Sequence, residues 1–229
     1  PNAPVLQDPG TYDTDGVVTW MWSAGGDGSG SGEAYYIIQI DDDPNFGSPL
    51  VTEEVLGTTY TISGLADGTW YARVRAVDKL GNEDPNVWSN VEDIIVDTIA
   101  PVITDVTLDD AIVQPSASIG VTVTTSGDAA NVTADGVALT ETAPGSGVWT
   151  GTITAQTAEG WHSVSVEACD LAGNCDHNYE VTYTVDNTPP SKPAYISPAD
   201  DFVTNGDVTL VWGESTVTNG IASYTLQYD

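Results

Sequence analysis

The stretch Val74-Arg75-Ala76-Val77-Asp78-Lys79-Leu80-Gly81-Asn82 occurs again, with substitutions, as Val166-Glu167-Ala168-Cys169-Asp170-Leu171-Ala172-Gly173-Asn174. In each copy an alternating segment runs into the sequence Asp-x-x-Gly-Asn. Alternation with a period of two predicts a half-buried β-strand, and Asp, Gly and Asn are typical of the tight turn that ends such a strand. The two copies therefore predict two strands that each run into a hairpin turn.

The spacing of the two copies indicates a modular chain. Asp78 and Asp170 are 92 residues apart, and Asp97 and Asp186, which close the next strand in each copy, are 89 apart. Each copy is followed by a short linker that contains proline. A repeat of about 90 residues that ends each time in a linker indicates tandem domains.

Residues 1–99 are expected to form the first module, an antiparallel β-sandwich. Its short strands are separated by turn signals, as in a sandwich, and we predict them at 4–6, 17–22, 35–40, 50–56, 58–62, 70–77 and 87–96. In the sixth strand, alternation places one set of side chains on the core face, namely Trp70, Ala72, Val74 and Ala76. The other face then carries Tyr71, Arg73 and Arg75.

Residues 100–187 are expected to form a second sandwich, with strands predicted at 103–108, 118–124, 129–134, 137–142, 147–155, 161–169 and 179–185. Residues 188–229 repeat only the beginning of the first module, because Val208–Trp212 matches Val18–Trp22 and Tyr224–Asp229 matches Tyr36–Asp41. We therefore predict an all-β chain of tandem antiparallel sandwiches whose third module is incomplete.

Several residues in the first module carry a resemblance to a known family. Trp20 lies on the second predicted strand, Tyr36-x-x-Gln39 on the third, and Leu65-x-x-Gly68-x-x-Tyr71 precedes Val-Arg-Ala. Over residues 4–97 this pattern resembles a fibronectin type III domain of the bacterial and archaeal extracellular kind. The strand, turn and linker that end the second module resemble a bacterial Ig-like domain. These resemblances imply tandem modules of a prokaryotic extracellular or cell-surface protein.

The composition of the chain excludes several partners. The sequence has 34 acidic and 4 basic residues and a formal net charge of −30. Nucleic acids and anionic membranes require a basic footprint, so neither is expected to bind. No apolar run reaches 18 residues, so no membrane span is expected. The charge suits a self-repelling soluble surface, the recruitment of divalent cations, or adaptation to high salt, and composition does not separate these.

Cys169 and Cys175 are the only cysteines, and they flank the second Asp-x-x-Gly-Asn turn. A cross-strand disulfide fits this spacing and implies an oxidising, extracytoplasmic compartment. Two free thiols or a metal pair are the alternatives. The separation of six residues matches no common zinc spacing, and no further cysteine could complete such a site.

Calcium is the cofactor that the sequence suggests, although none is required for the predicted fold. Ca²⁺ takes six to eight oxygen ligands, and carboxylates and amides gather in the turns and linkers. The candidate ligands are Asp78, Asn82, Asp97, Asp170, Asn174 and Asp186. The alternative is ordinary turn chemistry, in which Asp and Asn cap the turn without a metal.

Two further features point to surface chemistry. Asn131-Val132-Thr133 is an N-glycosylation sequence. Trp88, Trp149 and Trp161 with Tyr71 are candidates for exposed aromatic residues that stack on sugars, and packing on loops or at a module boundary is the alternative. His162 is expected to be a buried strand residue.

No catalytic pattern occurs in the sequence, which contains no nucleophile elbow, zinc-protease helix or phosphate loop. We therefore expect a non-catalytic spacer of a secreted or cell-surface protein: a stalk, a surface-layer or filament component, or an adhesin shaft. One alternative is a carbohydrate- or protein-binding accessory module of a larger enzyme. Another is a fibre subunit whose partial module is completed by a neighbour. The expected partners are other modules of the same polypeptide, a homopolymer, or a surface polysaccharide or protein.

Overall fold

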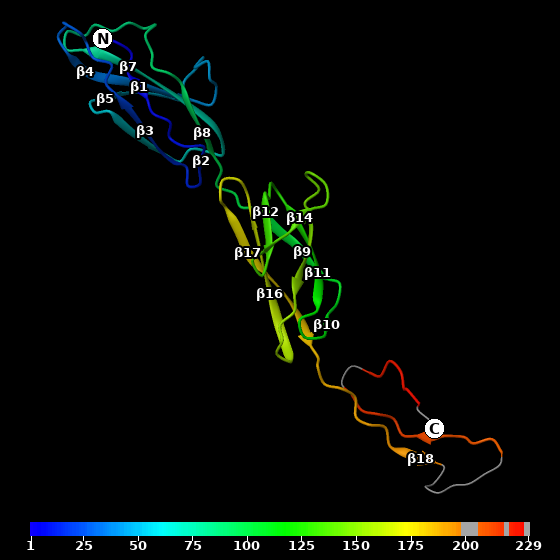
Figure 1. Cartoon of the computed structure of the whole chain (residues 1–229). Coiled ribbons are helices and arrows are strands. Elements are labelled where there is room, and N and C mark those ends of the chain that lie inside the picture. Colours follow the sequence, from blue (N-terminus) through cyan, green and yellow to red (C-terminus); the bar gives the residue numbers. More distant parts are fainter. Residues whose placement is uncertain (198–205, 218–219, 227–229) are drawn as a thin grey trace.

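The computed structural model describes residues 1–197, 206–217 and 220–226 (Figure 1). Every regular element within these ranges is a β-strand, which confirms the all-β prediction. The strands form two pairs of larger sheets and one small two-stranded sheet. No helix in the described ranges is long and apolar enough to cross a membrane.

The first sandwich consists of two sheets. One has the order β1 (Val5–Leu6), β3 (Val17–Ser23) and β6 (Thr59–Ser63). The other has the order β2 (Tyr12–Asp13), β8 (Glu92–Val96), β7 (Gly68–Asp78), β4 (Glu33–Asp41) and β5 (Val51–Val55). Each of the seven predicted strands overlaps a strand of the structure, but the last strand begins only at Glu92, and the two-residue β2 was not predicted.

The core of the first sandwich lies between the two sheets. Trp20 from β3 and Ile38 from β4 are fully buried there, and Val74 from β7 packs in the same cluster. Along β7 the alternate residues Trp70, Ala72, Val74 and Ala76 are all buried, which confirms the predicted core face. Burial of this many large apolar side chains is the main stabilising term of the module.

The outer face of β7 carries the two arginines, as alternation predicts. The guanidinium of Arg73 lies 4.3 Å from the ring centre of Phe46 and 4.2 Å from that of Trp88. Arg75 also lies over Trp88, at 4.8 Å, and its Nη2 is 2.8 Å from a carboxylate oxygen of Glu83. This stack of cationic and aromatic groups covers Trp88, which is half-buried.

The second sandwich is built in the same way. One sheet has the order β14 (Thr140–Glu141), β15 (Val148–Thr154), β11 (Ser118–Ser126) and β9 (Val102–Leu108). The other has the order β10 (Ile112–Val113), β17 (Cys175–Val185), β16 (Gly160–Cys169), β12 (Asn131–Ala134) and β13 (Val137–Ala138). Its core includes Ile119, Val123, Val164 and Tyr183.

The prediction of purely antiparallel sheets needs one correction that applies to both sandwiches. β2 pairs with β8 in parallel, and β10 pairs with β17 in parallel. In each case the chain crosses from one sheet to the other after its first strand and then joins the last strand of the module. These pairings are two residues long, so they leave no periodicity in the sequence.

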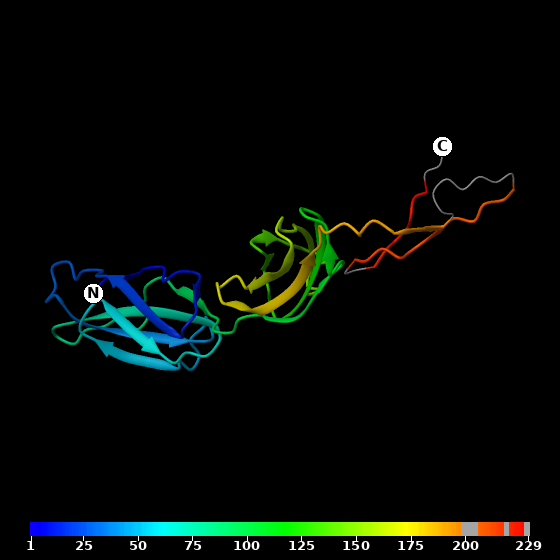
Figure 2. The ribbon, with the colours of Figure 1, turned by 90° about the horizontal axis from the view of Figure 1, so that it is seen from below.

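The sandwiches lie end to end, and the described part of residues 188–229 extends beyond the second one (Figures 1 and 2). In this part β18 (Tyr195–Ser197) pairs with β19 (Val211–Trp212). The strand predicted over Tyr224–Asp229 is absent from its described portion, residues 224–226, and the rest lies outside the described residues. In the first sandwich the equivalent strand β4 forms between β5 and β7, whereas residues 224–226 have no such partners among the described strands.

Candidate cation site at the junction of the two sandwiches

The two repeated turns are organised by their aspartates. The Oδ1 atom of Asp170 accepts hydrogen bonds from the backbone N–H groups of Gly173 at 2.7 Å and Asn174 at 2.9 Å. Its Oδ2 atom accepts a third from the Asn174 side-chain amide at 3.0 Å. Asp78 organises the first turn in a similar way, accepting from the backbone N–H groups of Leu80 and Asn82 and from the Asn82 side-chain amide. The turn chemistry weighed in the sequence is therefore present in both copies.

Both aspartates are buried although they end their strands near the surface. The Asn82 side-chain amide, by donating to the Asp78 carboxylate, holds the pKa of Asp78 below its ordinary value of 3.8, and the backbone N–H groups of the turn act in the same direction. A carboxyl group whose pKa is lower in the folded protein than in the unfolded chain stabilises the fold at pH values above its pKa in the unfolded chain. That contribution is lost as the pH falls through the folded pKa.

The linker between the sandwiches is held from both sides. Asp67 of the first sandwich accepts hydrogen bonds from the Thr98 backbone N–H at 3.0 Å and from its hydroxyl at 2.8 Å. From the second sandwich, Asn174 donates its side-chain amide to the Asp97 carbonyl at 2.8 Å. The turn that ends β16 therefore also contacts the segment that enters the second sandwich.

Three carboxylates meet at this junction. Asp97 comes from the linker, Asp128 from the loop between β11 and β12, and Asp170 from the repeated turn. One oxygen of each lies within 4.8 Å of the others. Asp170 is buried, Asp97 is half-buried and Asp128 is exposed, so the cluster opens to solvent on one side.

Among the described residues, no lysine or arginine forms an ion pair with this cluster. The chain has only four lysines and arginines. Arg73 and Arg75 lie in the stack around Trp88, Lys79 lies in the first repeated turn, and Lys192 follows the second sandwich. Carboxylate oxygens are the ligands that Ca²⁺ prefers, so a divalent cation is the species that would reduce the repulsion here.

The structure brings together only part of the predicted ligand set. Asp97, Asp170 and Asn174 lie at the junction. Asp78 and Asn82 lie at the other end of the first sandwich, because β7 begins opposite Val96, next to the linker, and runs away from it. Asp186 lies at the other end of the second sandwich, because β16 begins opposite Val185.

Asp128 was not among the predicted ligands. It belongs to a Ser-Gly-Asp segment that has no counterpart in the repeated turns or linkers. Its loop reaches the junction because β12 pairs with β16 on one side and β11 pairs with β9 on the other, and neither pairing can be obtained from local spacing.

The second sandwich also contains the predicted disulfide and the predicted glycosylation sequence. Cys169 and Cys175 form the expected disulfide, with an S–S distance of 2.03 Å. Asn131 is exposed on β12, directly opposite Cys169, so the glycosylation sequence lies on the same outer face as the disulfide.

The candidate surface aromatics fall into different environments. Trp149 is 7% exposed and donates its indole N–H to the Thr125 hydroxyl, so it is a core residue and neither the candidate surface aromatic nor a residue packed on a loop or at a module boundary. Its parity explains this, since Trp149 and Ile153 share the inner face of β15. Trp161 is 80% exposed. His162 is half-buried and bonds through Nε2 to the Ala158 carbonyl.

Comparison with known families gives a match within the second sandwich. A family model for the bacterial Ig-like domain matches residues 104–187, which confirms the resemblance expected for the second module. The search of curated proteins gave no match.

Solved structures of similar proteins contain fibronectin type III modules. The fibronectin(III)-like modules of Clostridium thermocellum CbhA are 18% identical to this chain, with a TM-score of 0.47, and the comparison covers 79% of this chain and 94% of that one. The FN1–FN3 domains of chicken CNTN1 are 15% identical, with a TM-score of 0.42 and coverages of 80% and 69%. The central fibronectin-III array of RIM-binding protein is 18% identical, with a TM-score of 0.28 and coverages of 88% and 75%.

Proposed function

We propose that this chain is a non-catalytic spacer segment of a secreted or cell-surface modular protein. Bacterial Ig-like domains typically serve as structural or linker domains, and residues 104–187 match that family. The partners in this proposal are further modules of the same polypeptide, which the spacer holds apart. The disulfide supports an oxidising, extracellular location.

The observation that carries the proposal is the anchored linker. Thr98 is bonded to Asp67 of the first sandwich, and Asp97 is bonded to Asn174 of the second. Ile103, in the first strand of the second sandwich, donates its backbone N–H to the Asp176 carboxylate at 2.9 Å. Only a few residues between these anchors are left to bend, so the two sandwiches are expected to hold a preferred angle. A net charge of −30 adds mutual repulsion between modules and favours an extended chain.

Replacing Asn174 with alanine is expected to loosen the junction. The substitution removes the side-chain bond to the Asp97 carbonyl, and one neutral hydrogen bond contributes about 1 kcal/mol. We expect a roughly fivefold increase in the population of conformations with a detached linker. Residual dipolar couplings measured separately for the two sandwiches would report this as a lower degree of common alignment.

Asn82→Ala is the matched control for this experiment. Asn82 makes the same bond to its own aspartate, but it lies at the far end of the first sandwich. The Asn82→Ala substitution should leave the relative alignment of the two sandwiches unchanged. If Asn174→Ala and the wild-type protein give the same alignment tensors for both sandwiches, the anchored spacer is contradicted.

We further propose that a calcium ion at Asp97, Asp128 and Asp170 stiffens the junction. Modules that bind Ca²⁺ outside the cell do so with Kd of roughly 10⁻⁴–10⁻³ M. Calcium at about 100 times Kd should then stabilise the folded junction by roughly 2.7 kcal/mol. Asp128→Asn should abolish the gain in melting temperature, and the exposed Asp110→Asn should retain it. Equal melting curves for the wild-type protein in Ca²⁺ and in EDTA would remove calcium from the proposal and leave the hydrogen-bonded linker intact.

A further inference from the structure

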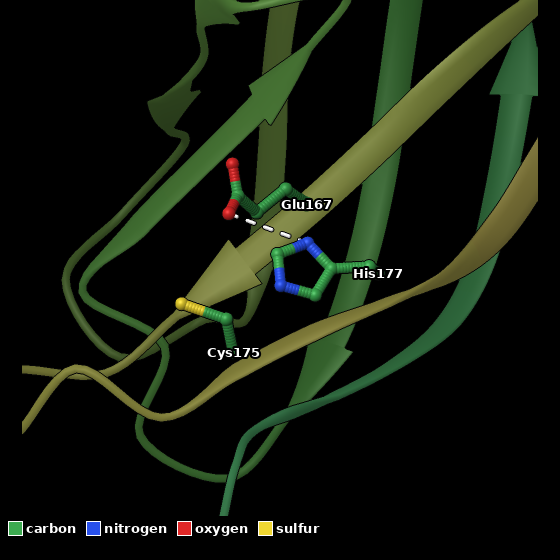
Figure 3. Close-up of side chains that lie close together, drawn as sticks. All are labelled: Glu167, Cys175 and His177. Atoms are coloured by element: carbon green, nitrogen blue, oxygen red, sulfur yellow. Dashed lines mark ion pairs between the residues drawn. The ribbon is translucent and has the colours of Figure 1, made fainter.

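Four side chains with metal-binding atoms lie on one outer face of the hairpin formed by β16 and β17. Cys169 and Cys175 are directly opposite each other in the ladder. Glu167 precedes Cys169 by two residues on β16, and His177 follows Cys175 by two on β17. Figure 3 shows the Glu167 carboxylate, the Cys175 sulfur and the His177 ring gathered at this place. The site is distinct from the carboxylates at the junction.

An irregularity in the ladder explains why His177 points outward. The register of β16 and β17 shifts between Val166 and Ala168, which is a β-bulge. Beyond the bulge, Tyr179 and Val181 pack against the core. Strict alternation would place His177 on that same inner face, but the extra residue reverses the parity and places it with Cys175 outside. The bulge therefore creates the cluster.

The spacing of the four groups suits a tetrahedral metal ion. His177 Nδ1 lies 3.3 Å from Glu167 Oε1. Nitrogen and oxygen ligands at the usual Zn²⁺ distances are separated by roughly 3.3 Å along a tetrahedral edge. The ligand atoms of Glu167, Cys175 and His177 lie within 4.8 Å of one another, and the sulfur of Cys169 is bonded to that of Cys175.

We propose that reduction of the Cys169–Cys175 disulfide opens a Zn²⁺ site made by Cys169, Cys175, His177 and Glu167. A dithiol reduces the S–S bond to two cysteine thiols and is itself oxidised to a disulfide. On binding Zn²⁺ the two thiols release two protons and coordinate as thiolates. In the oxidised protein the sulfur atoms are bonded to each other, so two of the four ligands are lost.

The chemistry of the ligands separates this site from the calcium site proposed at the junction. Thiolate and imidazole ligands select Zn²⁺, whereas the junction offers only carboxylates. The six-residue spacing and the lack of a third cysteine disfavour a zinc site made by cysteines alone, but His177 and Glu167 supply two further ligands. Both are accessible, since their side chains are 65% and 44% exposed. This inference does not rest on the proposed spacer function, and its site forms only where a reductant reaches the disulfide.

The second sandwich is expected to stay folded when the disulfide is reduced. The disulfide spans only six residues of sequence, so it removes less entropy from the unfolded chain than a bridge that closes a longer loop. The core lies on the opposite face of the hairpin, where Val166 and Ala168 are buried. A circular dichroism melting curve of the reduced protein checks this before metal is added.

The test uses the full chain with Co²⁺ as a spectroscopic probe for Zn²⁺. The protein is prepared oxidised, and also reduced with a phosphine that contains no thiol. We expect the reduced protein to bind one equivalent of Co²⁺, with a thiolate-to-metal charge-transfer band and the intense visible bands of a tetrahedral ion, and to lose both on addition of Zn²⁺. Surface carboxylates produce no thiolate band, so the acidic surface cannot imitate this signal.

Variants identify the two ligands that are not cysteine. His177→Ala and Glu167→Gln should each weaken Zn²⁺ binding by the reduced protein about 100-fold or more, since even indirect partners of a metal ligand are worth 10–100-fold. Glu180→Gln is the matched control, because Glu180 is an exposed carboxylate on β17, the strand that carries His177. It should leave the Zn²⁺ affinity of the reduced protein unchanged. A reduced protein without the thiolate band overturns the proposal. Wild-type affinity in both His177→Ala and Glu167→Gln overturns the assigned ligand set.

Discussion

Replacing Trp20 with alanine is expected to destabilise the first sandwich by about 3–5 kcal/mol, the range for truncating a buried tryptophan in a packed core. Trp20 is 0% exposed and lies in the centre of β3, with Ile38 and Val74 in the same cluster. The cavity left behind is bounded by two hydrogen-bonded sheets, which cannot close over it easily. Urea unfolding followed by tryptophan fluorescence measures the loss.

Trp161→Ala is the matched control, because Trp161 is 80% exposed on the outer face of the second sandwich. Its removal should change the free energy of unfolding by no more than about 0.5 kcal/mol. Trp20→Phe should lie between the two, since the indole N–H of Trp20 has no hydrogen-bond partner among the described residues. Comparable losses for Trp20→Ala and Trp161→Ala would contradict the core assigned to this module.

Asp170→Ala is expected to destabilise the second sandwich by about 2–4 kcal/mol, because it removes three hydrogen bonds to one charged, buried acceptor. The donors Gly173 and Asn174 then lose the group that holds the turn closed. Asn174 is also expected to lose its orientation toward the Asp97 carbonyl. Thermal unfolding should be measured in EDTA, so that the loss of a bound cation makes no contribution.

Asp110→Ala serves as the control for charge, since it also removes one carboxylate from the second sandwich but at an exposed position. Removing one of 34 acidic residues slightly reduces self-repulsion, so a small gain in stability is expected for Asp110→Ala. If Asp170→Ala behaves like Asp110→Ala, the turn does not depend on its aspartate.

Most of the fold prediction rested on the local alternation of apolar and polar residues along the strands. It placed Trp70, Ala72 and Val74 correctly, because the period of two in a strand is a local property. The same rule, applied to β15, would have placed Trp149 in the core. It could not find β2 or β10, since two residues have no period. It also could not anticipate the outward His177, because the bulge depends on the partner strand.

The candidate site was predictable only in the parts that repeat. Asp97 belongs to a linker sequence that occurs twice in the chain, and Asp170 belongs to a turn sequence that occurs twice. Both could therefore be singled out from the sequence. Asp128 reaches them through strand pairing between distant segments, which no local pattern records. Asp78 and Asp186 do not belong to the carboxylate cluster, because each lies a full strand length from the junction.

The parallel pairing of β2 with β8 has a mechanical consequence. Ile95 donates its backbone N–H to the Thr11 carbonyl, and Asp97 donates to the Asp13 carbonyl. A force that stretches the module along its length pulls these two strands in opposite directions along their axes. Both bonds are then loaded in shear at the same time, whereas an unzipping geometry would break them one by one. β10 and β17 repeat the arrangement, with Thr184 bonded to Ala111 and Asp186 to Val113.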